Sequence, residues 1–320
     1  MTHDNYVYEA VELLKKMIAT PSVSRDESRA ADIIEDYMTS RGLAPRREAN
    51  NVCAVCDDYD ESKPTMLLNA HIDTVKPVAT WTRDPFAPEI DGDRLYGLGS
   101  NDCGGGLTAL LQAYRAGLRR KREYNIVYVA SAEEEVSGSE GIVRVLPLLP
   151  EIDIAMVGEP TGMQPAIAEK GLMVIDGTAH GRSGHAARDE GINAINEALD
   201  DLMWLRDYRF ERVSRLLGAV KMSVTMITAG TQHNVVPDEC RFVIDVRTNE
   251  LYDNREVFDI IRSHLHSDVK ARSFRLNSSG IDACHPLVRR MTDMGMRPFG
   301  SPTLSDQALM PFPSLKLGPG

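Results

Sequence analysis

Two kinds of hydrophobic pattern alternate along the first half of the chain. Residues Tyr6 to Ala19 place apolar side chains three and four positions apart, which predicts an amphipathic helix. Short, nearly continuous apolar runs predict buried strands at Thr65–Ala70, Asn125–Ser131 and Ile152–Val157, and a helix over Leu107–Leu118 separates the first two. This alternation predicts an α/β domain with a largely parallel sheet and helices on both faces.

Local signals add elements around this framework. Ser24-Arg-Asp-Glu27 has the spacing of a capping box and predicts the start of a helix through Met38. A strand is expected near Asn51–Cys56, and a further helix is expected to begin near Gly138.

The rhythm changes after Gly171. The expected order becomes strand, helix, strand, strand, helix, strand, which is that of a ferredoxin-like module. The segments are Leu172–Ala179, Gly191–Leu205, Ala219–Ile227, Cys240–Thr248, Asn254–Leu265 and Val269–Leu276. A helix at Pro286–Met294 and a strand at Ser314–Leu317 then return to the first pattern. We therefore expect one domain formed by residues 1–170 and 279–320, interrupted by a smaller inserted domain at 171–278.

Composition narrows the class of protein. The 320 residues carry 36 basic and 47 acidic side chains, a net charge of −11, which disfavours nucleic acid and anionic membranes as partners. The sequence has no apolar run long enough to span a bilayer. Its five scattered cysteines do not look like a disulfide framework, so we expect a cytoplasmic protein.

Candidate metal ligands follow the predicted strands. His71 and Asp73 come directly after the first buried strand, Glu133-Glu-Glu135 follows the next, and Glu159 follows the third. Asp102 precedes the glycine run that opens a helix. Because ligands gather at the carboxyl ends of parallel strands, these side chains are expected to meet at one edge of the sheet.

One imidazole among several carboxylates suits a divalent ion such as zinc, cobalt or manganese. Asp102 has two oxygens, so it could bridge two ions roughly 3.5–4 Å apart. The adjacent Glu134 and Glu135 could divide the work, one binding metal while the other deprotonates a water molecule.

Seven motifs resemble the M20 metallopeptidase and aminoacylase family, and within it acetylornithine deacetylases most closely. They are Ala70-His-Ile-Asp-Thr-Val75, Trp81-Thr-Arg-Asp-Pro-Phe86, Leu95-Tyr-Gly-Leu-Gly-Ser-Asn-Asp102, Glu133-Glu-Glu-Val136, Gly158-Glu-Pro-Thr-Gly-Met-Gln-Pro165, Gly181-Arg-Ser-Gly-His185 and Asn234-Val-Val-Pro237. The resemblance implies a zinc-peptidase-like catalytic domain with the inserted module described above. It also implies a homodimer formed through that module.

The same resemblance implies a role for each candidate residue. His71, Asp102 and Glu159 would bind one metal ion, and Asp102 with Glu135 the other; two divalent ions, zinc or cobalt, are expected. Asp73 would orient His71, and Glu134 would be the general base. The bond from Asp102 to Cys103 is expected to be cis.

The family pattern also implies a last metal-binding histidine a few residues beyond the strand that leads to Gly318-Pro-Gly320. The sequence given ends there. Either the chain continues past Gly320, which we favour, or the second metal site lacks one protein ligand.

Three residues of the inserted module complete the predicted site. By resemblance, His185 would stabilise the oxyanion of the tetrahedral intermediate, often in a neighbouring subunit, while Asn234 and Arg247 would bind the carbonyl and carboxylate of the substrate. Lys170 and the Ser305-Asp306 pair are weaker candidates, for which a structural role is equally expected.

The function that these residues favour is hydrolysis of an N-acyl-L-amino acid, with N-acetyl-L-ornithine of arginine biosynthesis as the expected substrate. N-succinyl-L-ornithine, N-acetyl-L-citrulline and succinyl-diaminopimelate remain alternatives, because a single sequence does not reveal the acyl pocket. A non-catalytic metal-binding protein and a dipeptidase on the same fold are the other classes left open.

Overall fold

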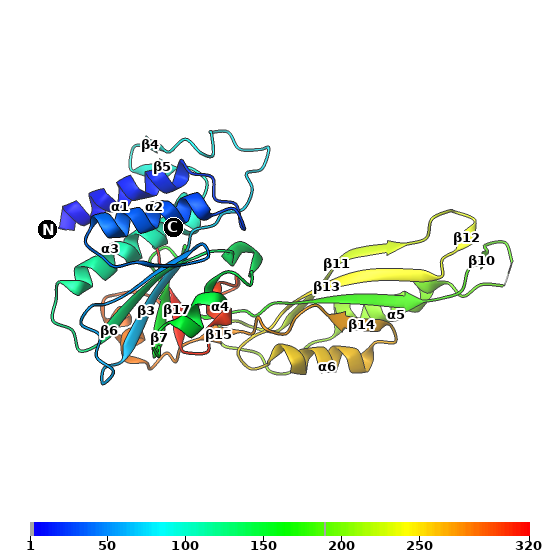
Figure 1. Ribbon diagram of the computed structural model, residues 1–320. Helices are drawn as coiled ribbons and strands as arrows, with labels where there is room; N and C mark the ends of the chain where they lie inside the picture. Colours follow the sequence, from blue (N-terminus) through cyan, green and yellow to red (C-terminus); the bar gives the residue numbers. More distant parts are fainter. Residues whose placement is uncertain (1–2, 189) are drawn as a thin grey trace. The chain divides into compact units, whose positions relative to one another are not determined.

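The structure, a computed structural model, describes residues 3–188 and 190–320 and divides into two compact units (Figure 1). Unit 1 contains the described residues up to Ile167 together with Gly280–Phe299 and Ser305–Gly320. Unit 2 contains the described part of Ala168–Ser279 and the short segment Gly300–Leu304. The second unit is therefore built mainly from one continuous stretch inserted into the first.

The sheet of unit 1 has a parallel centre and antiparallel edges. Its strand order is β1-β2-β6-β3-β7-β17-β8-β15, with β16 beside β8. Strands β6, β3, β7 and β17 run parallel, whereas β1, β2 and β8 pair antiparallel with their neighbours. The strands are β1 Arg46–Glu48, β2 Asn51–Val55, β3 Thr65–His71, β6 Asn125–Ser131, β7 Ile154–Val157, β8 Ala166–Glu169, β15 Ser279–Gly280, β16 Phe299–Ser301 and β17 Ser314–Lys316. The predicted α/β class is confirmed.

Alternating side chains of the central strands fill cores on both faces of this sheet. Leu68 and Ala70 of β3 join the core under helices α1 His3–Ile18, α2 Ser28–Ser40 and α3 Gly106–Leu118, which lie on one side in Figure 1. Leu67, between them in sequence, joins the core on the opposite face. That face is covered by α4 Ile142–Val145, η3 Leu146–Leu148 and η4 Asp306–Leu309, while α7 Pro286–Asp293 packs against β7 and β17.

Unit 2 is a four-stranded antiparallel sheet in the order β11-β13-β9-β14. In chain order its elements are β9 Met173–His180, α5 Ala194–Asp207, β11 Lys221–Ala229, β13 Glu239–Arg247, α6 Asn254–His264 and β14 Asp268–Ala271. Residues of both helices share cores with the sheet, and a small two-stranded antiparallel ribbon of β10 Gly184–His185 and β12 Val235–Val236 extends from it. This is the βαββαβ arrangement of a ferredoxin-like module.

Two local predictions are wrong. In the part of the chain that the structure describes, helix α2 has no side-chain cap at its N-terminus, because Ser24 and Glu27 bond to distant segments instead of forming a capping box. The helix expected near Gly138 begins only at Ile142, since residues 133–138 form a tight turn around η2 Glu134–Val136.

The remaining elements are a β4 Glu89–Asp91 and β5 Arg94–Tyr96 hairpin, and η1 Ser100–Gly105 before α3. None of the helices in residues 3–188 and 190–320 combines the length and hydropathy needed to cross a bilayer.

Candidate metal centre

The carboxyl ends of β3, β6 and β7 bring one imidazole and several carboxylates together in unit 1. His71 ends β3 and is 2% exposed. Its Nε2 atom lies 3.1 Å from Asp102 Oδ1, 3.9 Å from Glu134 Oε2 and 3.9 Å from Glu159 Oε1. The structure therefore brings together these predicted site residues, although they lie far apart in sequence.

The other ring nitrogen of His71 is held by Asp73. Nδ1 lies 2.8 Å from the carbonyl oxygen of Asp73 and 3.4 Å from its Oδ1. Because a carbonyl oxygen only accepts, this contact places a proton on Nδ1 and turns Nε2 toward the carboxylates. These contacts support the prediction that Asp73 orients His71.

Asp73 makes further contacts that sequence spacing did not reveal. Ser24 Oγ donates to Asp73 Oδ2 at 2.7 Å, and the backbone amides of Glu134 and Glu135 donate to Oδ1 and Oδ2 at 3.1 and 3.2 Å. Burial alone would raise the pKa of Asp73, but His71, Ser24 and the amide of Glu134 hold it below its usual value.

Asp102 is delivered by a glycine-rich loop. The Asp102–Cys103 peptide bond is cis, as the family resemblance implied. Gly106, at the start of α3, packs directly on the end of β7: a Cβ atom there would lie 2.2 Å from the carbonyl oxygen of Gly158. Only a glycine permits this approach, which sets Asp102 and Glu159 side by side.

The ligand atoms group in two sets whose members lie within 4.8 Å of one another. One set is His71, Asp102 and Glu135, and the other is His71, Cys103 and Glu159. Among the described residues, Glu159 Oε1 is buried and has no hydrogen-bond partner. An imidazole, several carboxylates and an unsatisfied buried oxygen form a donor set that fits a divalent cation.

The pKa directions describe the same excess of negative charge. Burial, with Asp102 and Asp306 nearby, raises the pKa of Glu159 to about 7, and burial raises that of Glu134 well above its usual range. Burial opposes charge on His71 too, yet Cys103, Asp102 and Asp73 raise its pKa well above the ordinary value. A divalent cation would supply the positive charge that these carboxylates otherwise take from protons.

Two contributors to this electrostatic field were underestimated from the sequence. Asp306 is 2% exposed and accepts a 2.6 Å hydrogen bond from Ser131 Oγ, and its pKa is raised to about 6, mainly by burial. Lys316 on β17 is also 2% exposed, and its charge lowers the pKa values of Glu159 and Asp102. No local motif marks either residue. The available signal was position, since Asp306 lies in the loop before the strand that was predicted at Ser314–Leu317, and Lys316 lies in that strand.

The predicted oxyanion-stabilising residue His185 and the predicted substrate-binding residues Asn234 and Arg247 all lie in unit 2. His185 and Asn234 are exposed neighbours, since β10 pairs with β12 and Ala186 N donates to the carbonyl of Asn234 at 3.0 Å. Arg247 stands at the other end of β13, about 25 Å along the strand by the usual rise per residue. Its guanidinium makes two hydrogen bonds to Asp245, at 2.8 and 3.0 Å. Within one chain, unit 2 therefore groups two of the three.

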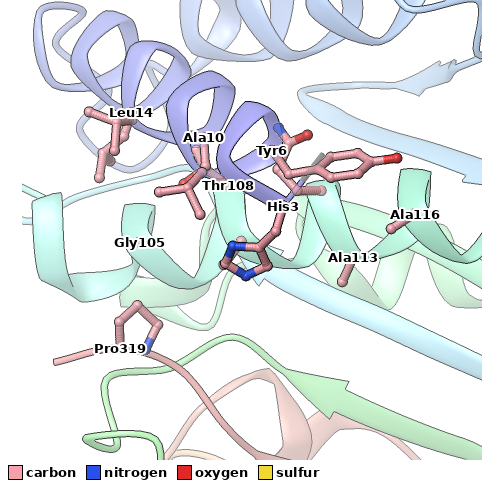
Figure 2. A pocket seen from close by; sticks show the side chains of 13 residues that line it. His3, Tyr6, Ala10, Leu14, Gly105, Thr108, Ala113, Ala116 and Pro319 are labelled. Carbon is pink, nitrogen blue, oxygen red and sulfur yellow. The ribbon is translucent and has the colours of Figure 1, made fainter. Parts of the chain in front are cut away.

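An apolar groove of about 550 Å³ lies between α1 and α3, lined by residues such as Tyr6, Leu14, Ala113 and Pro319 (Figure 2). In the part of the chain that the structure describes, none of its lining residues is acidic. None of the predicted site residues lines this groove.

Comparisons with known proteins agree with this architecture. Residues 167–272 match a peptidase dimerisation domain of the M20 type, and residues 51–162 match the model of peptidase family M28. The chain is 28% identical to the acetylornithine deacetylase of Proteus mirabilis (strain HI4320), in an alignment that covers 97% of this chain and 88% of that protein.

Solved structures share the fold at low identity. Aminopeptidase PepT from Bacillus cereus superposes with a TM-score of 0.77 at 16% identity, covering 99% of this chain and 90% of the other. A tripeptidase from Staphylococcus aureus superposes with a TM-score of 0.74 at 19% identity, covering 97% of this chain and 89% of the other. A dinuclear metal-binding peptidase of the M20 family from Bacillus subtilis superposes with a TM-score of 0.69 at 17% identity, covering 98% of this chain and 88% of the other. Over nearly its whole length the chain therefore resembles M20 peptidases and deacetylases, and residues 167–272 match the dimerisation domain of that family.

Proposed function

We propose that this protein is a hydrolase of the M20 type that cleaves the amide bond of an N-acyl-L-amino acid, with N-acetyl-L-ornithine as the leading substrate. The observation that carries the proposal is the carboxylate cluster around His71, in which Glu134 Oε2 lies 3.9 Å from the imidazole Nε2. The likeness to an acetylornithine deacetylase over nearly the whole chain supports the choice of substrate.

His71, Asp102, Glu135 and Glu159 are proposed to hold two divalent ions, zinc or cobalt. The resemblance implies that Asp102 would serve both ions. In the structure Asp102 groups with His71 and Glu135, whereas Glu159 groups with His71 and Cys103. Bound there, the ions would supply Lewis acidity. Asp73 keeps the ring of His71 in place through the contact to Nδ1.

Glu134 is proposed as the general base. Its side chain is 11% exposed, and its carboxylate is turned toward the ligands. The carboxylate takes a proton from the attacking water and later passes it to the leaving amine, so that one group serves both halves of the reaction.

His185 and Asn234 are proposed to act together on the acyl carbonyl, because the pairing of β10 with β12 presents them side by side. Arg247 is proposed to bind the substrate carboxylate, for which it would exchange its present pairing with Asp245. Since these two groups stand at opposite ends of β13, they need not serve the same active site.

The test is a substrate panel with Glu134→Gln as the diagnostic variant. Purified protein supplied with zinc or cobalt is assayed on acetylornithine, succinylornithine, acetylcitrulline, succinyl-diaminopimelate and an unblocked dipeptide. We expect acetylornithine to give the highest kcat/KM, and Glu134→Gln to bind zinc normally but lose about 10²–10⁴-fold in kcat. Faster cleavage of the dipeptide would make the protein a peptidase, and wild-type turnover in the variant would remove Glu134 from the mechanism.

A further inference from the structure

In the loop after β6, which carries the proposed base Glu134, three consecutive backbone amides donate hydrogen bonds to carboxylates from two other segments. Glu133 N donates to Glu27 Oε1 at 3.3 Å. Glu134 N and Glu135 N donate to the two carboxylate oxygens of Asp73 at 3.1 and 3.2 Å. The position of this loop is therefore set from outside, by Glu27 and Asp73.

Glu27 is fully buried and commits its whole carboxylate to this region of unit 1. Besides the amide of Glu133, Oε1 accepts from the backbone amide of Arg25, and Oε2 accepts from Asn50 Nδ2 at 2.9 Å. Arg25 has a φ of 76°, the left-handed conformation, which few non-glycine residues adopt. Glu27 is thus a junction between the start of α2, the β1–β2 turn and the loop after β6.

The loop after β6 has little regular structure of its own. Glu133 and Ser137 both have positive φ, at 54° and 44°, and only the three-residue turn η2 lies between them. The Glu133 carboxylate folds back over Gly138, where a Cβ atom would lie 1.7 Å from Oε2. A turn of this kind needs outside hydrogen bonds to keep a single conformation.

We propose that Glu27 is a positioning residue for hydrolysis: together with Asp73, it anchors the backbone of residues 133–135 and so holds the Glu134 and Glu135 carboxylates where the reaction needs them. The inference rests on the proposed function, because it takes Glu134 as the base. It also explains why Ser24-Arg-Asp-Glu27 does not cap α2: Ser24 bonds to Asp73, and Glu27 bonds to the loop that Asp73 also holds.

Glu27→Ala removes the anchor, whereas Glu27→Gln keeps an oxygen that can accept from both backbone amides. We expect the alanine variant to lose about 10–100-fold in kcat with KM changed less than about threefold, because misplacing a catalytic group by about 1 Å costs up to about 10²-fold. The glutamine variant should stay within about fivefold of wild type in kcat.

The matched control is Glu9→Ala. Glu9 is also a carboxylate of unit 1 that accepts several hydrogen bonds, from Tyr37, Arg41 and Arg115. Among the described residues, its hydrogen-bond partners include none of the proposed site. Its loss should lower the melting temperature without lowering kcat. Hydrogen exchange of the amides of residues 133–136, measured without metal, should accelerate in Glu27→Ala and not in Glu9→Ala.

The outcomes separate the two hypotheses. If wild type hydrolyses no N-acyl amino acid, the proposed function fails, and the exchange measurement still decides whether Glu27 anchors the loop. If wild type is active and Glu27→Ala matches Glu9→Ala in kcat and in exchange, the inference is overturned. If the alanine variant does not fold, Glu27→Asp is compared with the same control, because aspartate withdraws the carboxylate by one methylene. Unchanged kcat and unchanged hydrogen exchange in Glu27→Asp would equally overturn the inference.

Discussion

Asp73→Asn is the most informative single change at the metal centre. Asp73 is 1% exposed, and its two oxygens accept from Ser24 Oγ and from the backbone amides of Glu134 and Glu135, while Oδ1 lies 3.4 Å from His71 Nδ1. An asparagine has the same shape but only one accepting oxygen. Whichever way the amide turns, its NH₂ group faces at least one buried N–H donor.

The expected cost follows from that mismatch. Leaving one buried donor unsatisfied costs about 1–3 kcal/mol. For a domain of this size, that corresponds to a fall of about 2–12 °C in melting temperature. Because Asp73 also holds the ring of His71, zinc affinity should fall by about 10–100-fold.

Asp201→Asn is the matched control for this experiment. Asp201 is likewise 1% exposed and accepts from two consecutive backbone amides, those of His266 and Ser267, at 2.9 and 2.8 Å, but it lies in unit 2. Calorimetric melting without metal and zinc titration are measured on both variants. Both should melt at lower temperature, and only Asp73→Asn should lose zinc affinity. Equal zinc affinity in Asp73→Asn and wild type would refute the orienting role.

Two further changes test the glycine contact and the dimer. Gly106→Ala should lower the free energy of unfolding by about 1–3 kcal/mol and weaken zinc binding, because its Cβ would meet the backbone of Gly158. Gly117→Ala in the same helix is the control, since its Cβ would meet only the flexible end of a side chain. Melting and zinc titration are measured on both variants, and equal values would contradict the prediction. We propose a homodimer formed through unit 2. Met226 is 62% exposed on edge strand β11, so Met226→Glu should shift the sedimentation coefficient toward that of a monomer. Val78→Glu, at a residue 61% exposed in unit 1, should not, and the same behaviour of both variants would argue against this interface.

The strands, and the sheet edge at which the candidate metal ligands meet, were predictable because both follow from short stretches of sequence. Asn125–Ser131 is a continuous apolar run, and the strand in the structure has the same bounds. Once such runs are taken as parallel strands, the polar residues after them must share one sheet edge, which is where His71 and Glu159 lie.

Contacts between distant segments were not predictable in this way. Ser24 and Glu27 fit a capping box, and a local pattern cannot show that their partners lie 49 and 106 residues away. The same holds for Asp306, whose bond to Ser131 spans 175 residues. Cap residues are favoured by only about 1 kcal/mol, so several buried hydrogen bonds elsewhere outweigh a local preference.

Hydrogen bonding also distinguishes Asp73, the carboxylate that holds the loop in place, from Glu159, the carboxylate that is proposed to bind a cation. Asp73 and Glu159 leave adjacent strands at the same sheet edge, and both are largely buried. Asp73 receives a hydroxyl and two amide hydrogens, so its charge is compensated by the protein and its pKa falls. Among the described residues, Glu159 Oε1 receives no donor, and the pKa of Glu159 rises to about 7. A buried carboxylate oxygen without a donor destabilises the metal-free fold unless the carboxylate is protonated, and a divalent cation would remove that penalty. The protein therefore orders the loop with the satisfied carboxylate of Asp73 and leaves one oxygen unsatisfied on Glu159, the residue proposed to bind metal.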